Sequence, residues 1–320
     1  MSESPPAKRQ RTDASLTRSK IWYKDGSIVL QAENTQFRVH WSVLSENSAF
    51  FAGLEGLPQP NDQPTVDGCP LVELSDDAVV DVEYLLKALY TPTFLLQKAL
   101  PFAVVAALIR LGRNYDFRDL LDTAVERLVF GNPTTLEGYD ALITADNSYR
   151  STRILCQPGL LYDMLTLARE NNIQSALPCA YYRAIIYENR ISLFEGIPRK
   201  DGTRTSLPPI DQRRCVLGHE ALLKIQSQTG YTVGWLFSWS EDDCTNPTKC
   251  TRARVHCLRR YGQMLPVYAL CHVNPGAATW FCRSCEKCYK ESWAAGRKKV
   301  WEELPKFFDL PPWDHLTNDL

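Results

Sequence analysis

The sequence predicts an α+β protein in which a small N-terminal sheet of three strands with packed helices is followed by a mostly α-helical C-terminal region. Two segments, residues 27–32 and 36–40, carry β-branched residues or alternate polar with apolar residues, and a turn residue lies between them. This pattern is typical of a hairpin. Further along, apolar residues recur at helical spacing in segments that end at Gly or Pro. Strands and helices in this order indicate helices packed on a short sheet.

The 320 residues suffice for one large domain or two ordinary ones. Residues 1–20 are rich in Ser, Pro and basic side chains, and we expect them to form a disordered basic tail. Its run Lys8-Arg9-Gln10-Arg11 fits a short nuclear-import signal, or simply a solvated tail. We expect residues 21–131 to form the sheet-containing domain and residues 132–320 the helical region. The sequence leaves open whether the middle helices form a separate domain.

The first domain continues with a helix over residues 41–54, a surface loop over residues 58–70 with four prolines, and a third strand over residues 71–74. Ser75 is expected to cap the next helix, because serine is a favoured N-cap residue. That helix has one apolar face, made of Val79, Val82, Leu86 and Leu89.

The remaining helices are predicted from apolar periodicity and from their start and stop residues. Pro101 is expected in the first turn of one helix, with Val104, Leu108 and Leu111 on its buried side. The other predicted segments are helices over residues 117–130, 160–171 and 178–187, a polar loop over residues 198–209, and a long apolar-periodic stretch over residues 216–239.

One string of the first domain, QFRVHWSVLSENSAFF at residues 36–51, carries a resemblance to a known family. It resembles the strand-to-helix core of the BTB/POZ family, in which a strand that ends in histidine leads into a helix of the type V-L-x-x-x-S-x-x-F. The matching residues are His40, Val43, Leu44, Ser48 and Phe51. The resemblance covers residues 21–131. The phrases DGSIVLQAENTQFRVH and GRKKVWEELPKFFDLPPW are also similar to the BTB proteins of mushroom-forming fungi.

The resemblance implies a non-enzymatic protein that self-associates, as a homodimer, and recruits other proteins. Some members of the family act as adaptors of cullin-type ubiquitin ligases, and others act in transcription. The residue after the histidine is usually basic, but here it is Trp41, which puts in doubt the charged pocket of many transcriptional members. We expect Trp41 either near an interface or in core packing. We expect His40 either near an interface or at the helix start, where it would form a hydrogen bond with the backbone. Phe37, Val39 and Leu44 are expected in the core.

Cysteines near the C-terminus form the clearest chemical pattern. The spacing is C-x5-C followed by C-x2-C, and we select Cys244, Cys250, Cys282 and Cys285 as ligands of a structural zinc ion. Cys288 is an alternate member of the second pair. The competing interpretation is that these residues are small apolar core residues without a metal. A redox or metal-dependent activity at the cysteines is a third hypothesis.

Basic residues lie around these cysteines, at Arg252, Arg254, Arg259, Arg260 and residues 297–299. A nuclear regulator that contacts DNA through this region is therefore the alternative function. We favour a solvated helix face opposite a buried aromatic stripe of Tyr289, Trp293, Val300 and Leu304, with Pro305 as the stop. The chain's net charge of −1 gives no global attraction to nucleic acid or membrane.

Other function classes receive no support from motifs. The sequence has no phosphate-binding loop, dinucleotide fingerprint or nucleophile elbow, and His219-Glu220 is not completed to H-E-x-x-H. No apolar segment reaches the length of a transmembrane helix. Eleven cysteines without a secretory signal favour a reducing intracellular compartment, nucleus or cytoplasm.

Overall fold

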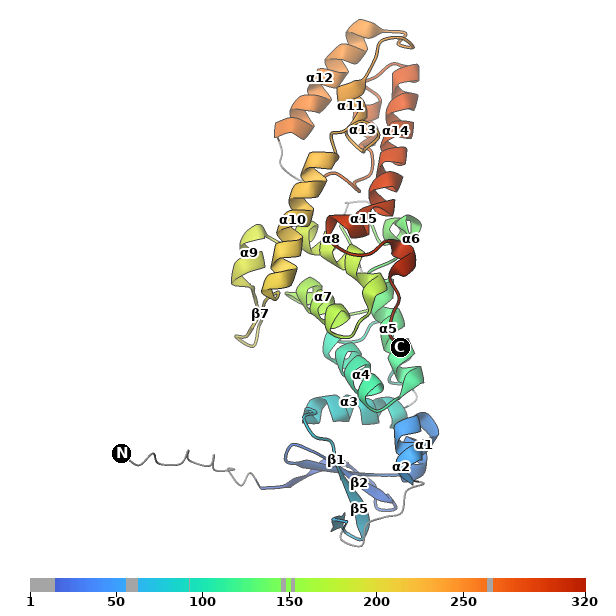
Figure 1. The fold of residues 1–320 in the computed structure, drawn as a ribbon, viewed down its shortest axis with the longest axis vertical. Helices are drawn as coiled ribbons and strands as arrows, with labels where there is room; N and C mark the ends of the chain where they lie inside the picture. Colours follow the sequence, from blue (N-terminus) through green and yellow to red (C-terminus); the bar gives the residue numbers. More distant parts are fainter. Residues whose placement is uncertain (1–14, 56–62, 92, 145–147, 151–152, 264–266) are drawn as a thin grey trace, which may run out of the picture. The chain divides into compact units, whose positions relative to one another are not determined.

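The computed structural model describes residues 15–55, 63–91, 93–144, 148–150, 153–263 and 267–320 (Figure 1). The import signal predicted at Lys8-Arg9-Gln10-Arg11 lies outside the described residues. The chain divides into two compact units. The first comprises Met1–Gln97, Ala103–Ala124 and Leu320, and the second comprises Lys98–Phe102 and Val125–Asp319. The division therefore falls inside a helix, a few residues before the boundary predicted at residue 131.

The first unit contains a mixed sheet of five strands in the order β1-β3-β2-β5-β4. β2 pairs with β3 in antiparallel fashion, whereas β1 pairs with β3 and β5 pairs with β2 in parallel. The bounds are β1 Thr17–Trp22, β2 Ile28–Ala32, β3 Thr35–Val39, β4 Thr65–Val66 and β5 Cys69–Glu73. In Figure 1 the helices of this unit lie on one side of the sheet.

The three predicted strands are confirmed as β2, β3 and β5, and the sheet gains β1 and β4 at its edges. β2 is central, and four of its five residues are fully buried, which explains its nearly continuous apolar sequence. Phe37, Val39 and Leu44 are fully buried, as predicted. The expected tail over residues 1–20 is wrong at its end, because Thr17 already pairs with Thr35. The expected loop over residues 58–70 likewise contains β4 and the start of β5.

The helices of the first unit follow the predicted order with two differences. The predicted helix over residues 41–54 is broken at Ser48, which is extended. The Ser48 hydroxyl donates to the carbonyl of Tyr115 (2.5 Å) and accepts from the N–H of Phe51 (3.1 Å). Ser75 is not a cap, since the next helix begins at Val79 and Asp76 adopts a positive φ of 71°. The bounds are α1 Trp41–Asn47, α2 Ala49–Glu55, α3 Val79–Tyr90, α4 Phe102–Asn114 and α5 Arg118–Phe130.

The second unit is mostly helical, as predicted. Its first elements are α6 Leu136–Ala141, α7 Leu160–Glu170, the 3₁₀ helix η1 Gln174–Ala176, α8 Leu177–Tyr187, α9 Arg190–Glu195, β6 Ile197–Pro198, β7 Arg204–Thr205 and α10 Pro209–Ile225. The segment predicted as a polar loop thus contains a short hairpin of β6 and β7. The later elements are α11 Trp235–Ser238, α12 Pro247–Gln263, α13 Pro275–Ala278, α14 Arg283–Glu302, α15 Leu304–Phe307 and η2 Trp313–His315. The apolar-periodic stretch predicted over residues 216–239 is not continuous, because α10 ends at Ile225 and α11 begins only at Trp235.

A buried carboxylate connects three helices of this unit. Asp211, in the first turn of α10, is fully buried. It accepts a hydrogen bond from Nε of Arg169 on α7 (2.8 Å) and from the hydroxyl of Tyr181 on α8 (2.5 Å). The charge is therefore both paired and hydrogen-bonded, as a charge in a protein interior has to be.

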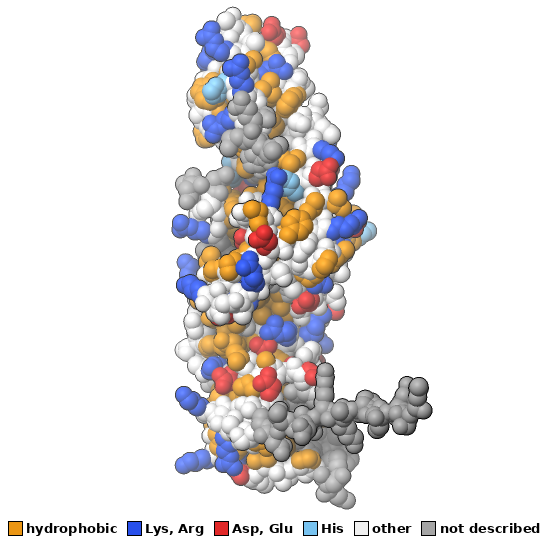
Figure 2. Space-filling model, turned by 90° about the vertical axis from the view of Figure 1, so that its left-hand side faces the viewer, with side chains coloured by type: hydrophobic (Ala, Val, Ile, Leu, Met, Phe, Trp, Pro, Cys, Tyr) orange, Lys and Arg blue, Asp and Glu red, His pale blue; other side chains and the backbone are white. Residues whose placement is uncertain are grey.

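The apolar stripe of α14 is confirmed, because Tyr289, Trp293 and Val300 are buried. The expectation of a solvated basic face is wrong for Arg297. Its side chain is buried, donates from Nε to the carbonyl of Leu270 (3.0 Å) and forms an ion pair with Asp140. Most basic residues of α12 differ from Arg297 in being exposed. Figure 2 shows Lys, Arg and His side chains gathered on the surface where α12 faces the viewer.

None of the described helices combines the length and apolar character that a bilayer-spanning helix needs.

Candidate functional site

Two helix starts bring the four selected cysteines together in the second unit. Cys250 lies in the first turn of α12, and Cys244 lies in the turn that precedes this helix. Cys282 is the N-cap residue of α14 and Cys285 lies in its first turn. In Figure 1, α12 and α14 run alongside each other with α11 and α13 between them. The thiols therefore lie where the positive ends of two helix dipoles stabilise a thiolate.

The geometry of these thiols fits a tetrahedral metal site. The four Sγ atoms all lie within 4.8 Å of one another, and the Cys244 and Cys282 sulfurs are 4.0 Å apart. A zinc ion with Zn–S bonds of about 2.3 Å holds its sulfurs about 3.8 Å from one another. Two N–H groups donate to sulfurs of the group: the Cys282 amide to Cys250 (3.1 Å) and Nε1 of Trp239 to Cys285 (3.5 Å). Such donors orient and stabilise metal-bound thiolates.

The ionisation of the group shows why it suits a cation. Hydrogen bonds from the Thr245 side chain and the Cys285 amide lower the pKa of Cys282 to about 5. Burial raises the pKa values of Cys250 and Cys285. The Cys282 thiolate is therefore stable by itself, while the thiols of Cys250 and Cys285 need a positive charge in the site before they lose their protons.

The cysteines also belong to a small hydrophobic cluster. Cys250, Cys282 and Cys285 pack among Leu236 and Phe281. The full cluster comprises Val233, Leu236, Cys250, Ala253, Cys257, Ala277, Ala278, Phe281, Cys282, Cys285, Tyr289 and Trp293. A core of this size gains stability from a metal that links its elements.

The remaining cysteines lie outside the group. Cys288, the alternate ligand, is half-buried on α14 and is not among the four close sulfurs. Cys257 is buried in the cluster, and burial raises its pKa to about 11. Cys156 is exposed, whereas the other ten cysteines are buried or half-buried.

The two predicted interface residues lie at the start of α1. The His40 amide donates to the hydroxyl of Tyr90 (2.8 Å), and its ring contacts the same hydroxyl and the carboxylate of Asp25 (3.3 Å). Its ring partners are thus side chains and not the backbone group that we expected. Trp41 is half-buried, and its Nε1 donates to the carbonyl of Phe51 (3.4 Å). These contacts fix both rings within one unit, and a role in an interface stays a prediction.

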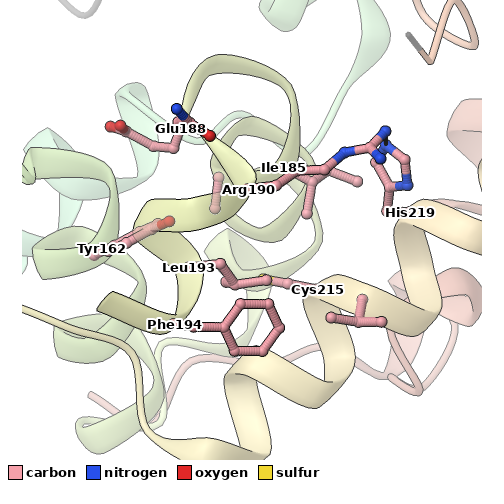
Figure 3. A pocket seen from close by; sticks show the side chains of 11 residues that line it. Tyr162, Ile185, Glu188, Arg190, Leu193, Phe194, Cys215 and His219 are labelled. Carbon is pink, nitrogen blue, oxygen red and sulfur yellow. Dashed lines mark hydrogen bonds between the residues drawn. The ribbon is translucent and has the colours of Figure 1, made fainter. Parts of the chain in front are cut away.

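The second unit also carries an apolar pocket of about 250 Å³ that the sequence did not predict. Figure 3 shows side chains of α9 and α10 around it, with Arg190 and His219 together on one side and Glu188 on another. Its lining residues are Tyr162, Ala184, Ile185, Glu188, Asn189, Arg190, Leu193, Phe194, Cys215, Val216 and His219. Phe194, at 63% exposure, and Val216, at 42%, leave apolar surface in solvent at its rim.

Three ionisable groups of this pocket, Cys215, His219 and Glu188, have shifted pKa values. Burial raises the pKa of Cys215 to about 12, so its thiol stays protonated. Burial, with the charge of Arg190, lowers the pKa of His219, and Arg190 lies 2.9 Å from its Nε2. Burial also raises the pKa of Glu188. Burial thus shifts all three groups toward their neutral forms, which keeps the pocket largely apolar.

Comparison with known proteins assigns the first domain. The family model described as BTB/POZ domain matches residues 23–130. This domain is a protein-interaction module, so the match supports a role in protein–protein interaction. No curated protein is similar enough to be a significant match. The likeness to fungal BTB proteins therefore stays a prediction.

Proposed function

We propose, from the BTB/POZ match at residues 23–130, that the chain is a non-enzymatic protein that self-associates through its first domain and recruits other proteins. The recruited complex is a cullin-type ubiquitin ligase, for which the chain acts as substrate adaptor. The match carries the proposal, because BTB domains typically self-associate and bind other proteins.

The edge of the sheet supports self-association. β1 is a terminal strand of the sheet, and in the described part of the chain only one of its sides is paired. Such an edge presents free N–H and C=O groups that a strand of another chain can pair with. Trp41 is the first residue of α1, two residues after the end of β3, and is only half-buried, so it is the predicted anchor of a homodimer contact.

We expect the intact chain to sediment as a dimer, with twice the 36.4 kDa of one chain. Trp41→Glu should weaken this dimer by about tenfold or more, because a charge replaces an aromatic anchor and hot-spot residues contribute about 2 kcal/mol or more. Leu96→Glu is the control, since Leu96 is 79% exposed in the same unit and lies outside the proposed contact. Sedimentation equilibrium measures the dissociation constants, and a monomer at all concentrations would contradict self-association.

The apolar pocket is the proposed place where a recruited protein docks in the second unit. Its volume of about 250 Å³ suits one large apolar side chain, and exposed apolar residues at its rim can continue the contact. We expect Val216→Arg, which places a charge in the pocket wall, to deplete a set of co-purified proteins severalfold in quantitative mass spectrometry.

Leu217→Arg is the matched control for this experiment. Leu217 is exposed to 45%, against 42% for Val216, but it does not line the pocket. Equal depletion by both variants would show that the pocket has no special role. A cullin that is retained by both variants while other proteins are lost from Val216→Arg would support the adaptor role.

We further infer that Cys244, Cys250, Cys282 and Cys285 hold a structural zinc ion. The sulfur-only ligand set, the short sulfur–sulfur distances and the two helix starts support zinc over plain packing. The ion would link α12 to α14 and so stabilise the end of the second unit.

A further inference from the structure

α12 concentrates positive charge without any compensating carboxylate of its own. Its 17 residues include Lys249, Arg252, Arg254, Arg259 and Arg260 and no Asp or Glu, although the chain as a whole has a net charge of −1. α14 differs, because its Lys287, Lys290 and Lys298 each lie within 4.0 Å of a glutamate four residues away. The positive charge of α12 is therefore not balanced by glutamates one turn away on the same helix, as is common on exposed helices.

The fold places part of this charge on the outer side of the helix. Cys250, Ala253 and Cys257 face the hydrophobic cluster, so the opposite face of the helix points to solvent. Arg252, His256 and Arg259 are exposed at positions i, i+4 and i+7 and lie on one face. Among the described residues, no carboxylate lies within ion-pair distance of Arg252, Arg259 or Arg260.

Two other cations of the helix have structural partners. Lys249 donates to the carbonyl of Phe281 (2.9 Å), and Nε of Arg254 donates to the carbonyl of Leu236 (2.6 Å). These contacts attach α12 to the rest of the cluster. The unpaired group is thus Arg252, Arg259 and Arg260 with His256, and we call it the α12 basic face.

The surface on both sides of this face is hollowed. One hollow, of about 580 Å³, lies toward Trp280, and the other, of about 700 Å³, lies toward Glu241. Arg252 and His256 line both hollows. The helix is therefore a ridge with cations on its crest, and Figure 2 shows the basic side chains over this part of the molecule.

We propose that the α12 basic face binds double-stranded DNA, with the helix in the major groove and its cations at the phosphates of both strands. The major groove is about 12 Å wide, which matches the diameter of an α-helix with its side chains. Hollows beside the ridge leave room for the two backbones. This function is separate from self-association and does not depend on the first domain.

Other polyanions fit this surface less well. The major groove of an RNA duplex is too narrow and deep for a helix. A single strand needs aromatic rings as stacking platforms, but the half-buried Trp280 has its ring against His256 at a centroid distance of 4.6 Å. An anionic membrane needs an apolar stripe to insert, whereas Val255 is the single exposed large hydrophobic residue among the described side chains of this helix.

The test uses the full chain and a fluorescently labelled 20-base-pair duplex of mixed sequence. Anisotropy titrations between 50 and 200 mM NaCl give the affinity and its salt dependence. We expect binding at 50 mM NaCl that weakens steeply with salt, because each neutralised phosphate contributes about −0.9 to the slope of log K against log salt. The variant Arg252→Gln, Arg259→Gln, Arg260→Gln should lower the affinity by about tenfold or more and reduce the slope by roughly 1 for each residue.

The control variant is Lys224→Gln, Lys287→Gln, Lys298→Gln. It removes the same charge from three exposed lysines that each lie beside a glutamate four residues away, and it leaves the α12 basic face and the basic tail intact. It should bind the duplex nearly as well as the native chain. Equal loss in both variants would overturn the proposal, as would no binding at 50 mM NaCl. Tighter binding to a polyglutamate peptide than to the duplex would overturn it in favour of an acidic protein partner.

Discussion

Removal of zinc should unfold the end of the second unit that α11 to α14 form. We expect the purified chain to contain about one zinc ion and to lose it when Cys282 and Cys285 are replaced by serine. Zinc contributes about 10–16 kcal/mol to the folding of small zinc-dependent peptides, which is more than the small cluster around Leu236 and Phe281 can supply by itself. Metal analysis measures the ion, and hydrogen exchange measures the loss of protected amides in α12 and α14.

Cys288→Ser is the matched control for this prediction. Cys288 lies one helical turn beyond Cys285 and was the alternate ligand by spacing, but its sulfur is outside the group of four. The control should retain zinc and protection. Loss of zinc from Cys288→Ser would mean that the ligand set is different. A metal-free native chain whose exchange is unchanged by a chelator would contradict the zinc site and favour four packed thiols.

Breaking the buried ion pair at Asp211 should be the most damaging single change in the helical core. Arg169→Met removes the cation and leaves a fully buried carboxylate with Tyr181 as its remaining partner. Removal of one member of a buried pair costs about 3–5 kcal/mol, because the other charge is left without compensation. Hydrogen exchange of the most protected amides in α7, α8 and α10 measures this loss.

Two further variants separate charge burial from general damage. Adding Asp211→Asn to Arg169→Met should recover part of the stability, because an amide can still accept from Tyr181 without a buried charge. The pair of Lys224 and Glu220 is exposed and also lies on α10, so Lys224→Met should cost far less stability than Arg169→Met. A loss below about 1 kcal/mol for Arg169→Met would show that water reaches Asp211.

The sequence predicted the elements that depend on local patterns. β2 and β3 are adjacent in sequence and pair through a short turn, so alternation and the turn residue sufficed. β1 was missed because its sequence TRSKIW is mainly polar, and its partner in parallel pairing lies 18 residues away. The break at Ser48 was missed because the bond that holds it goes to Tyr115, 67 residues later. Contacts of this range leave no local signal.

In the candidate sites, too, local spacing was predictable and contacts between distant segments were not. The C-x2-C spacing selected Cys282 and Cys285, and the structure brings them to Cys244 and Cys250. Spacing did not separate Cys285 from Cys288, because that choice depends on where α12 meets α14. The apolar pocket was not predicted, since α8, α9 and α10 form it only when packed. The helix over Pro247–Gln263 was also not predicted, so its charged residues were not assigned to one face.

The single exposed thiol at Cys156 has a practical consequence. The other ten cysteines are buried or half-buried, so a maleimide dye should reach Cys156 first on the native chain without any substitution. Two chains labelled there with a donor and an acceptor fluorophore would report their separation by energy transfer. The chain thus carries its own attachment point for measuring distances in an assembly.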